Sequence, residues 1–505
     1  MEMKKAVERI GMACLCCSVF YSFSLSAKDD FQQWMQQQSS GVMAQKKEFQ
    51  AYKDKRDKAF TVFLKAQWKA VDIVKGNVRD EAPKPDVMPV ARPEPVAPAP
   101  VSKPGSGSGV KSMPANKPVV IVVPEPELIA PPVVAPVIKS PAGKLLTIDF
   151  YGRKIHFYYD DGLRQRLSSS INKNTVSDYW SDLSKADYDG LLNQLMAQKK
   201  SLQLNDWAYV SLINALSISI NSHRHNDSAL LSWFLLIKSG YKVRIAYSKT
   251  LIYLLVPSEQ AMFDVPYFTF SGQRYYAIDF DGEKQRPGHV YTYDGEYPNA
   301  SKKLDMQVNA VVAASDQSER RHLSFTFEGK QYNVNVAYDR GRVKFFNSYP
   351  QLNLNLYFGS GVYKVTATPL QKQLAVYMQG MSEQRAVNFL LRFVQTSLKY
   401  ETDEQQFGEE NYLFPEETLF YPYSDCEDRA VLFTWLVKSL LNLDVVGLDY
   451  PGHVAAAVHF NDEVAGDSVS FKGKRYVITD PTYINASVGM SMPDFKRHKP
   501  TVIAY

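Results

Sequence analysis

The sequence predicts an α+β protein in which a helix carrying Cys426 packs on an antiparallel sheet. Three observations predict this class. Apolar helical runs are followed by short strands rich in apolar residues. Two long stretches of the chain repeat each other. A cysteine, a histidine and an aspartate follow in order on a predicted helix and two predicted strands. The 505 residues, 45% hydrophobic and 22% charged, have an ordinary globular composition and allow about three domains.

Residues 1–27 have the layout of a secretory signal peptide. A basic start ending at Arg9 precedes an apolar run, Ile10–Leu25, and small residues around Ala27 offer a cleavage site. The sequence therefore predicts an exported protein, periplasmic or secreted. Membrane anchoring through an uncleaved or lipidated N-terminus stays open, although neither Cys16 nor Cys17 has the leucine three residues earlier that a bacterial lipidation site usually has.

Cysteine usage and charge narrow the function classes. Three of the four cysteines lie in the predicted signal peptide, so Cys426 is alone in the rest of the chain. An exported protein stabilised by disulfides would carry an even number, so Cys426 is either an inert buried thiol or a reactive one. The net charge of +5 is small, and no basic cluster interleaved with aromatic residues supports nucleic-acid binding.

Two non-globular segments follow the predicted signal peptide. Residues 28–78 are rich in Gln, Lys and Ala, lack proline, and are predicted to be helical. Within them, Lys47 to Trp68 resembles the helical region before the catalytic domain of some membrane-bound lytic murein transglycosylases. Residues 79–142 are a Pro-rich linker, and an extended chain of this length reaches roughly 100 Å or more.

The globular remainder contains an internal repeat. Leu146–Tyr159 matches Leu323–Val336 at an offset of 177 residues, and both read as hairpins around a glycine turn. From residue 225 to residue 279 the offset is 201 without a gap, which locates an insertion around Lys399–Ser424 of the second copy. The predicted domains are therefore a degenerate copy at 143–300, a β-rich segment at 318–375 and a catalytic copy at 376–505.

The second copy places a cysteine at a predicted helix start. Ser424 followed by Glu427 has the spacing of a capping box, with Ser424 as the helix cap and Cys426 in the first turn. The helix dipole favours a thiolate at this position. The neighbouring Asp425, Glu427 and Asp428 oppose it, so an imidazolium is expected to supply most of the thiol activation.

Two predicted strands supply the remaining groups. His453 begins a short apolar strand, and Asp480 ends another, where Pro481 stops the ladder. A thiol that attacks a carbonyl needs a base to accept its proton, and that base needs a carboxylate to orient it. Cys426, His453 and Asp480 are therefore the candidate catalytic triad.

Three motifs carry a resemblance to a known family. Asp425-Cys426-Glu427-Asp428, Gly452-His453-Val454 and Thr479-Asp480-Pro481-Thr482 resemble the motifs of bacterial transglutaminase-like cysteine peptidases, over roughly residues 380–490. The resemblance implies a papain/transglutaminase-like domain that uses neither cofactor nor metal. It makes Cys426 the nucleophile, His453 the general base and acid, and Asp480 the orienting group. It also implies an oxyanion donor, for which Tyr423 and Asn411 are the side-chain candidates.

Alternatives remain for several positions. His459 lies on the same predicted strand face as His453 and is the second choice of base. In the first copy the triad positions fall on His225, Ile252 and Asp279, which predicts a pseudoenzyme domain. Ser228 lies nearby without a matching base. His223, His225 and Asp227 are read as a polar loop, because no further ligand pair has zinc-like spacing.

The favoured function is an exported cysteine peptidase, amidase or transglutaminase-like acyltransferase. Its expected partner is a protein or peptide of the cell envelope, with peptidoglycan as one candidate substrate. The alternative is a non-catalytic envelope binding or assembly module on a transglutaminase-like scaffold. A degenerate first copy, a helical N-terminus and a Pro-rich linker suit a protein that bridges partners, and an unreactive, buried Cys426 would favour this alternative.

Overall fold

The computed structural model describes a subset of the chain: residues 47–48, 50–66, 68–72, 88–91, 118–119, 121–122, 143–167, 170–278, 289–308 and 318–505. The chain divides into two compact units, 1–66 and 67–505. In the first, residues 50–66 are helical. The predicted signal peptide lies outside the described residues. Among those described, no helix combines the length and apolar character that crossing a bilayer requires.

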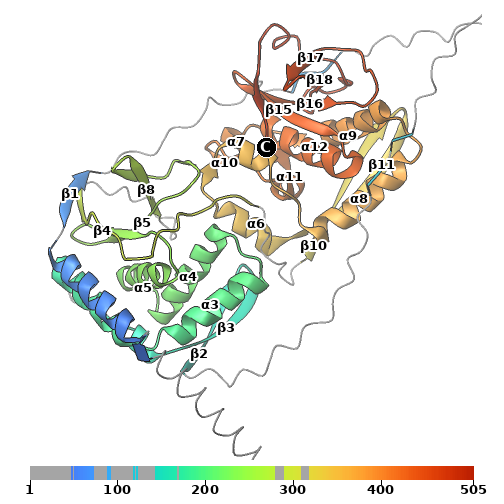
Figure 1. Ribbon diagram of the computed structural model, residues 1–505. Helices are drawn as coiled ribbons and strands as arrows, with labels where there is room; N and C mark the ends of the chain where they lie inside the picture. The colour runs from blue at the N-terminus through green and yellow to red at the C-terminus, as the bar shows by residue number, and fades with distance from the viewer. Residues whose placement is uncertain are drawn as a thin grey trace, which may run out of the picture. The chain divides into compact units, whose positions relative to one another are not determined.

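Residues 143–308, called here the first half, consist of a hairpin, four long helices and a sheet (Figure 1). Their elements are β2 (Lys144–Phe150), β3 (Arg153–Tyr159), η1 (Asp161–Leu163), α2 (Lys173–Lys185), α3 (Asp189–Ser201), α4 (Asp206–Ile220), α5 (His225–Lys238), β4 (Arg244–Tyr247), β5 (Ile252–Val256), β6 (Met262–Phe263), β7 (Tyr267–Phe270), β8 (Gln273–Ile278) and β9 (His289–Thr292). With β1 (Lys69–Asp72), the antiparallel sheet has the order β1-β9-β4-β5-β8-β7.

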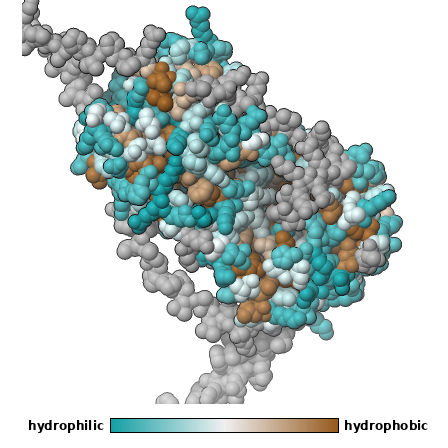
Figure 2. Space-filling model, turned by 180° about the vertical axis from the view of Figure 1, so that it is seen from behind, coloured by the Kyte–Doolittle hydropathy of each residue, from teal (hydrophilic) through white to brown (hydrophobic). Residues whose placement is uncertain are grey.

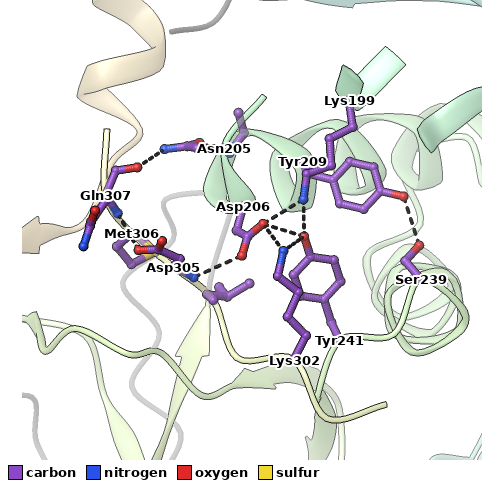
Figure 3. A network of polar contacts seen from close by, with 12 residues as sticks. Lys199, Asn205, Asp206, Tyr209, Ser239, Tyr241, Lys302, Asp305, Met306 and Gln307 are labelled. Atoms are coloured by element: carbon purple, nitrogen blue, oxygen red, sulfur yellow. Dashed lines mark hydrogen bonds and ion pairs between the residues drawn. The ribbon is translucent and has the colours of Figure 1, made fainter. Parts of the chain in front are cut away.

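An ionic network around a buried carboxylate ties the first half together (Figure 3). Asp206, the first residue of α4, accepts hydrogen bonds from Lys199 and Lys302, both at 2.7 Å, and from the Tyr241 hydroxyl at 2.7 Å. The backbone N–H of Asp305 donates to its second oxygen at 3.1 Å. One carboxylate therefore joins α3, α4 and two loops that are distant in sequence.

Residues 318–505, called here the second half, have a longer series of elements. These are β10 (Ser318–Phe327), β11 (Lys330–Asp339), α6 (Arg340–Asn347), β12 (Gln351–Leu352), α7 (Leu354–Phe358), α8 (Lys364–Met378), α9 (Glu383–Ser397), β13 (Lys399–Tyr400), α10 (Asp403–Phe407), α11 (Pro415–Phe420), β14 (Tyr423–Ser424), α12 (Cys426–Leu441), β15 (Asp444–Tyr450), β16 (His453–His459), β17 (Ser468–Phe471), β18 (Lys474–Thr479) and β19 (Thr501–Ile503). The antiparallel sheet has the order β17-β18-β16-β15-β19.

The second half has one large apolar core. Leu323, Phe325 and Phe327 alternate along β10 and are buried, as the two-residue period of a strand requires. They pack with Phe389 and Phe393 of α9, and the same core takes in α12 and the strands β15 and β16. Helix α12 is buried on nearly every side, so the cysteine at its start is held in the interior.

The two halves have matching architectures. Read from the opposite end, β7-β8-β5-β4-β9 of the first sheet corresponds to β17-β18-β16-β15-β19 of the second. Strands β5, β7 and β8 begin 201 residues before β16, β17 and β18, and the hairpin strand β3 begins 177 residues before β11. The change of offset falls where β13, α10, α11 and β14 are inserted between α9 and α12.

Three expected boundaries differ from the structure. Lys69–Asp72 of the predicted helical segment 28–78 is a strand, because it pairs with β9 along its whole length. The predicted β-rich segment 318–375 is β-rich only as far as β11, and it continues into helices α6, α7 and α8. Helix α8 shares the large core with α9 and α12, so the second half extends from 318 rather than from 376.

The described parts of the predicted linker lie on the second half. Val90 forms a bridge with Ile484, and Pro118 forms one with Ser382. The Val122 N–H donates to the Leu440 carbonyl at 2.8 Å. These residues therefore do not belong to a free spacer.

On the face shown in Figure 2, hydrophilic side chains predominate and apolar ones form small separate groups.

Candidate active site

Helix α12 places Cys426 at its first position. The N-cap is Asp425, and Asp428, three residues later, accepts the Asp425 N–H at 3.4 Å. The expectation that Ser424 caps this helix is wrong. Ser424 lies in strand β14, paired with Tyr400, and its hydroxyl accepts a hydrogen bond from the Arg429 side chain at 3.1 Å. Ser424 with Glu427 and Asp425 with Asp428 both fit the capping spacing, and the pairing of Ser424 with Tyr400 leaves Asp425 as the cap.

The Cys426 thiol is buried and held in its neutral form. Its exposed fraction is 0%, and Sγ donates a hydrogen bond to Glu427 Oε2 at 3.0 Å. Burial raises the thiol pKa well above its ordinary value, and the negative charges of Glu427 and Asp425 raise it further. The backbone N–H of Val454 hydrogen-bonds to the sulfur and acts in the opposite direction. The sulfur therefore lies at the start of β16, beside the residue that follows His453.

His453 and Asp480 form a buried pair. Nε2 of His453 lies 2.9 Å from Oδ2 of Asp480, and both side chains are almost fully buried. The other carboxylate oxygen accepts the backbone N–H groups of Thr482 at 2.9 Å and Tyr483 at 3.1 Å, which fixes the direction of the carboxylate. The ring of Phe495 stacks on the imidazole at 4.7 Å.

The contact with Asp480 determines which imidazole nitrogen can act as a base. A neutral imidazole that donates from Nε2 to a carboxylate has its lone pair on Nδ1. Nδ1 of His453 is buried and makes no hydrogen bond within the described part of the chain. Nδ1 is therefore the nitrogen that can accept a proton.

Cys426 and His453 line one cavity of about 370 Å³. Its wall consists of the start of α12, the β15–β16 turn, the insertion and the C-terminal segment. The lining residues are Leu354, Glu410, Tyr412, Cys426, Glu427, Asp449, Tyr450, Pro451, Gly452, His453, Val454, Lys499 and Thr501. Three carboxylates, Glu410, Glu427 and Asp449, face one lysine, Lys499, so the cavity is predominantly acidic.

A cluster of carboxylates lies behind the thiol. Asp403, Asp425 and Asp428 bring oxygens within 4.8 Å of one another, and so do Asp403, Glu410 and Glu427. Burial raises the pKa of Asp403, Asp425, Glu427 and Asp428, and their mutual repulsion raises the pKa of Asp403, Asp425 and Glu427 further. Both oxygens of Asp425 and Oε1 of Glu427 are buried and have no hydrogen-bond partner among the described residues. Carboxylate oxygens in this arrangement could hold a hard cation such as Ca²⁺.

Sequence reasoning could not have found this cluster. His223, His225 and Asp227, which the sequence favours as a polar loop, are not part of this cluster. Asp403 and Glu410 belong to the insertion and meet the α12 carboxylates only through folding. The available signal is the density of acids around Cys426, which does not reveal that Asp403 and Glu410 join them.

The secondary candidates lie elsewhere. Tyr423 and Asn411 do not border the cavity, and the Asn411 side chain accepts a hydrogen bond from Gln351 at 2.5 Å. His459 is at the opposite end of β16 and hydrogen-bonds to the Arg475 carbonyl at 2.9 Å. Of the two histidines on β16, only His453 lines the cavity with Cys426.

The first half carries different groups at the triad positions. His225 is the first residue of α5, and its Nε2 lies 3.2 Å from the Ile252 carbonyl, at the start of β5. Asp279 lies outside the described residues. The Ser228 hydroxyl donates back to the Arg224 carbonyl at 2.8 Å, so it is used within its own helix. The described part of this site has neither the thiol nor the base.

No model of a known protein family, no curated protein and no solved structure matches the chain.

Proposed function

We propose that the protein is an exported cysteine peptidase or amidase of the transglutaminase-like, papain/transglutaminase fold class, with Cys426, His453 and Asp480 as its triad. One observation carries the proposal. A buried His453–Asp480 pair at 2.9 Å leaves Nδ1 without a partner among the described residues, on a cavity that Cys426 also lines. A thiol, an oriented base and space for a substrate are the parts that acyl transfer through a thioester needs.

The proposed reaction has two steps. Sγ of Cys426 bonds to the carbonyl carbon of an amide while the thiol proton passes to Nδ1 of His453. The C–N bond then breaks, the departing amine takes that proton, and a thioester remains. In the second step water attacks the thioester, gives a proton to His453, and the C–S bond breaks as the thiol regains the proton. An amine in place of water gives transamidation.

The electrostatics add a requirement for activation. The resting thiol donates to Glu427 rather than to His453, and its pKa is raised. Asp480 stabilises the imidazolium that forms when His453 accepts the proton. A cationic group on the substrate, bound among the cavity carboxylates, would reduce the negative field at the sulfur. Envelope peptides, including murein peptides, are the proposed substrates.

The test is thiol-dependent cleavage by the full-length protein. Purified murein and a protein substrate are incubated with the native chain and with Cys426→Ser, His453→Ala and His459→Ala variants. Release of new amines by the native chain, absent from the first two variants and kept in the third, is the expected result. His459→Ala is the matched control, because it removes a histidine from the same strand outside the cavity.

A binding or assembly module is the second candidate. The observation that favours it is the fully buried Cys426 with a raised thiol pKa. Under this alternative, Cys426→Ser and His453→Ala have no effect on any substrate, and alkylation of Cys426 is slow and indifferent to His453. The cleavage results and the alkylation results each decide between the two functions.

A further inference from the structure

The first half retains a cavity at the position of the active site. It has a volume of about 410 Å³ and includes the start of α5 and the β4–β5 turn. Four of its lining residues lie 201 positions before residues that line the second-half cavity: His225, Asn226, Lys249 and Thr250, which correspond to Cys426, Glu427, Tyr450 and Pro451. The first half has therefore lost the catalytic groups but kept the hollow.

The charge of this hollow is reversed. At two corresponding lining positions, a residue of the second half is replaced by a more positive one: Glu427 by Asn226, and Tyr450 by Lys249. The lining residue Arg224 corresponds to Asp425, which lies next to the second-half lining. Arg166 adds a further cation to the lining. The second-half cavity is mainly acidic, whereas this one is mainly basic.

Two of its cations have no anionic partner in the part of the chain that the structure describes. Arg224 is engaged, because its Nε donates to Asp227 Oδ2 at 2.5 Å. Arg166 and Lys249 are exposed on the wall, and no carboxylate among the described residues pairs with either one. The lining therefore has more positive than negative charge, and these two cations are available to a ligand.

The wall of the cavity is held in place. The Asn226 side chain donates to the Thr250 carbonyl at 2.9 Å and accepts the Ile252 N–H at 2.9 Å, which ties α5 to the β4–β5 turn. Asp227 accepts the Leu167 N–H at 2.7 Å. The start of α5 is in the lining, and a helix N-terminus favours a negative charge. A ligand would meet a preformed site.

We propose that the first half is a binding module whose retained cavity takes the oxyanion of a small ligand, a carboxylate or a phosphate, between Arg166, Lys249 and the start of α5. Three observations point to an anionic ligand: the charge reversal at the corresponding positions, the two available cations and the fixed wall. The proposal does not depend on activity at Cys426.

The test is calorimetric titration of the full-length protein with inorganic phosphate and, separately, with succinate, at constant ionic strength in chloride buffer. Saturable binding of one or both is expected, and the stronger ligand identifies the source of the oxyanion. The double variant Arg166→Gln with Lys249→Gln is expected to weaken binding at least about tenfold, because two charge-assisted contacts are lost. Lys249→Tyr, which introduces the second-half residue, is expected to weaken it as well.

Two controls distinguish this cavity from others. Arg320→Gln with Lys372→Gln removes the same charge from exposed positions of the second half and should leave binding unchanged. Lys499→Gln removes the cation of the second-half cavity and should also have no effect. Absence of saturable binding of both ligands, or an equal loss in either control, would overturn the proposal. All substituted side chains are exposed, and circular dichroism checks the fold of each variant.

Discussion

Asp480→Asn tests whether the His453 tautomer controls the thiol. Oδ1 of Asp480 accepts two backbone N–H groups, so the asparagine oxygen is expected to keep that position, because an amide nitrogen cannot accept them. The amide NH₂ then faces Nε2 of His453 and donates to it. The imidazole proton must move to Nδ1, where it prevents acceptance of the thiol proton.

The expected magnitude follows from the contact. The native pair is charge-assisted, 2.9 Å long and almost fully buried. In the productive tautomer the variant lacks this charge-assisted contact, which contributes about 1.5–3 kcal/mol. At about 1.4 kcal/mol per tenfold, the loss is roughly 10- to 150-fold in rate. Stability should change less, because both backbone contacts to the side chain remain.

The assay is the rate of Cys426 alkylation by iodoacetamide at neutral pH, together with cleavage of any substrate found. Peptide mapping by mass spectrometry separates Cys426 from the three N-terminal cysteines. Asp462→Asn is the matched control, an exposed acid on the loop after β16. If Asp480→Asn alkylates and cleaves at the native rates with an unchanged unfolding midpoint, the assignment of Nδ1 as the base is wrong.

Two further predictions concern charge. Burial is the largest cause of the raised thiol pKa, and the negative charge of Glu427 is the next. Glu427→Gln removes that charge, so Cys426 alkylation at neutral pH should accelerate by about tenfold per pKa unit recovered; an unchanged rate would contradict this. Burial alone would raise the pKa of Asp206, but contacts with Lys199, Lys302, Tyr241 and the Asp305 N–H outweigh it and hold the pKa below 3.8. Its stabilisation is therefore present above that pH and lost as pH falls through the lowered value. Asp206→Asn should reduce the free energy of unfolding by about 1–3 kcal/mol at neutral pH and flatten its acid dependence, measured in urea against Asp187→Asn.

Local patterns predicted the elements of the site correctly. Short apolar runs predicted a strand that starts at His453, and β16 starts there. They also predicted a strand that ends with Asp480, whereas β18 ends one residue earlier, at Thr479. The start of the helix was missed by one residue. Asp425 and Ser424 both suit a cap, and the choice depends on pairing with Tyr400, which is distant in sequence. Local rules do not contain that information.

The environment of the thiol could not be predicted from local sequence patterns for the same reason. The acids next to Cys426 are visible in the sequence, but their burial is not, and burial is the largest cause of the raised pKa. Asp403 and Glu410 come from the insertion, which sequence comparison could locate but not place in space. The prediction that an imidazolium activates the thiol remains untested, because the resting thiol contacts Glu427.

The insertion distinguishes the two halves more than the differences at the candidate triad positions do. In the second half, Lys399–Ser424 supplies Glu410 and Tyr412 to the cavity wall and Asp403 to the carboxylate cluster. In the first half, α4 ends at Ile220 and α5 begins at His225, so no such wall is present between them. The short connection instead positions Arg224 as the N-cap. The same scaffold thus carries an acidic, walled cavity beside a thiol in one half and an open, basic one in the other, and the length of a single connection accounts for much of the difference.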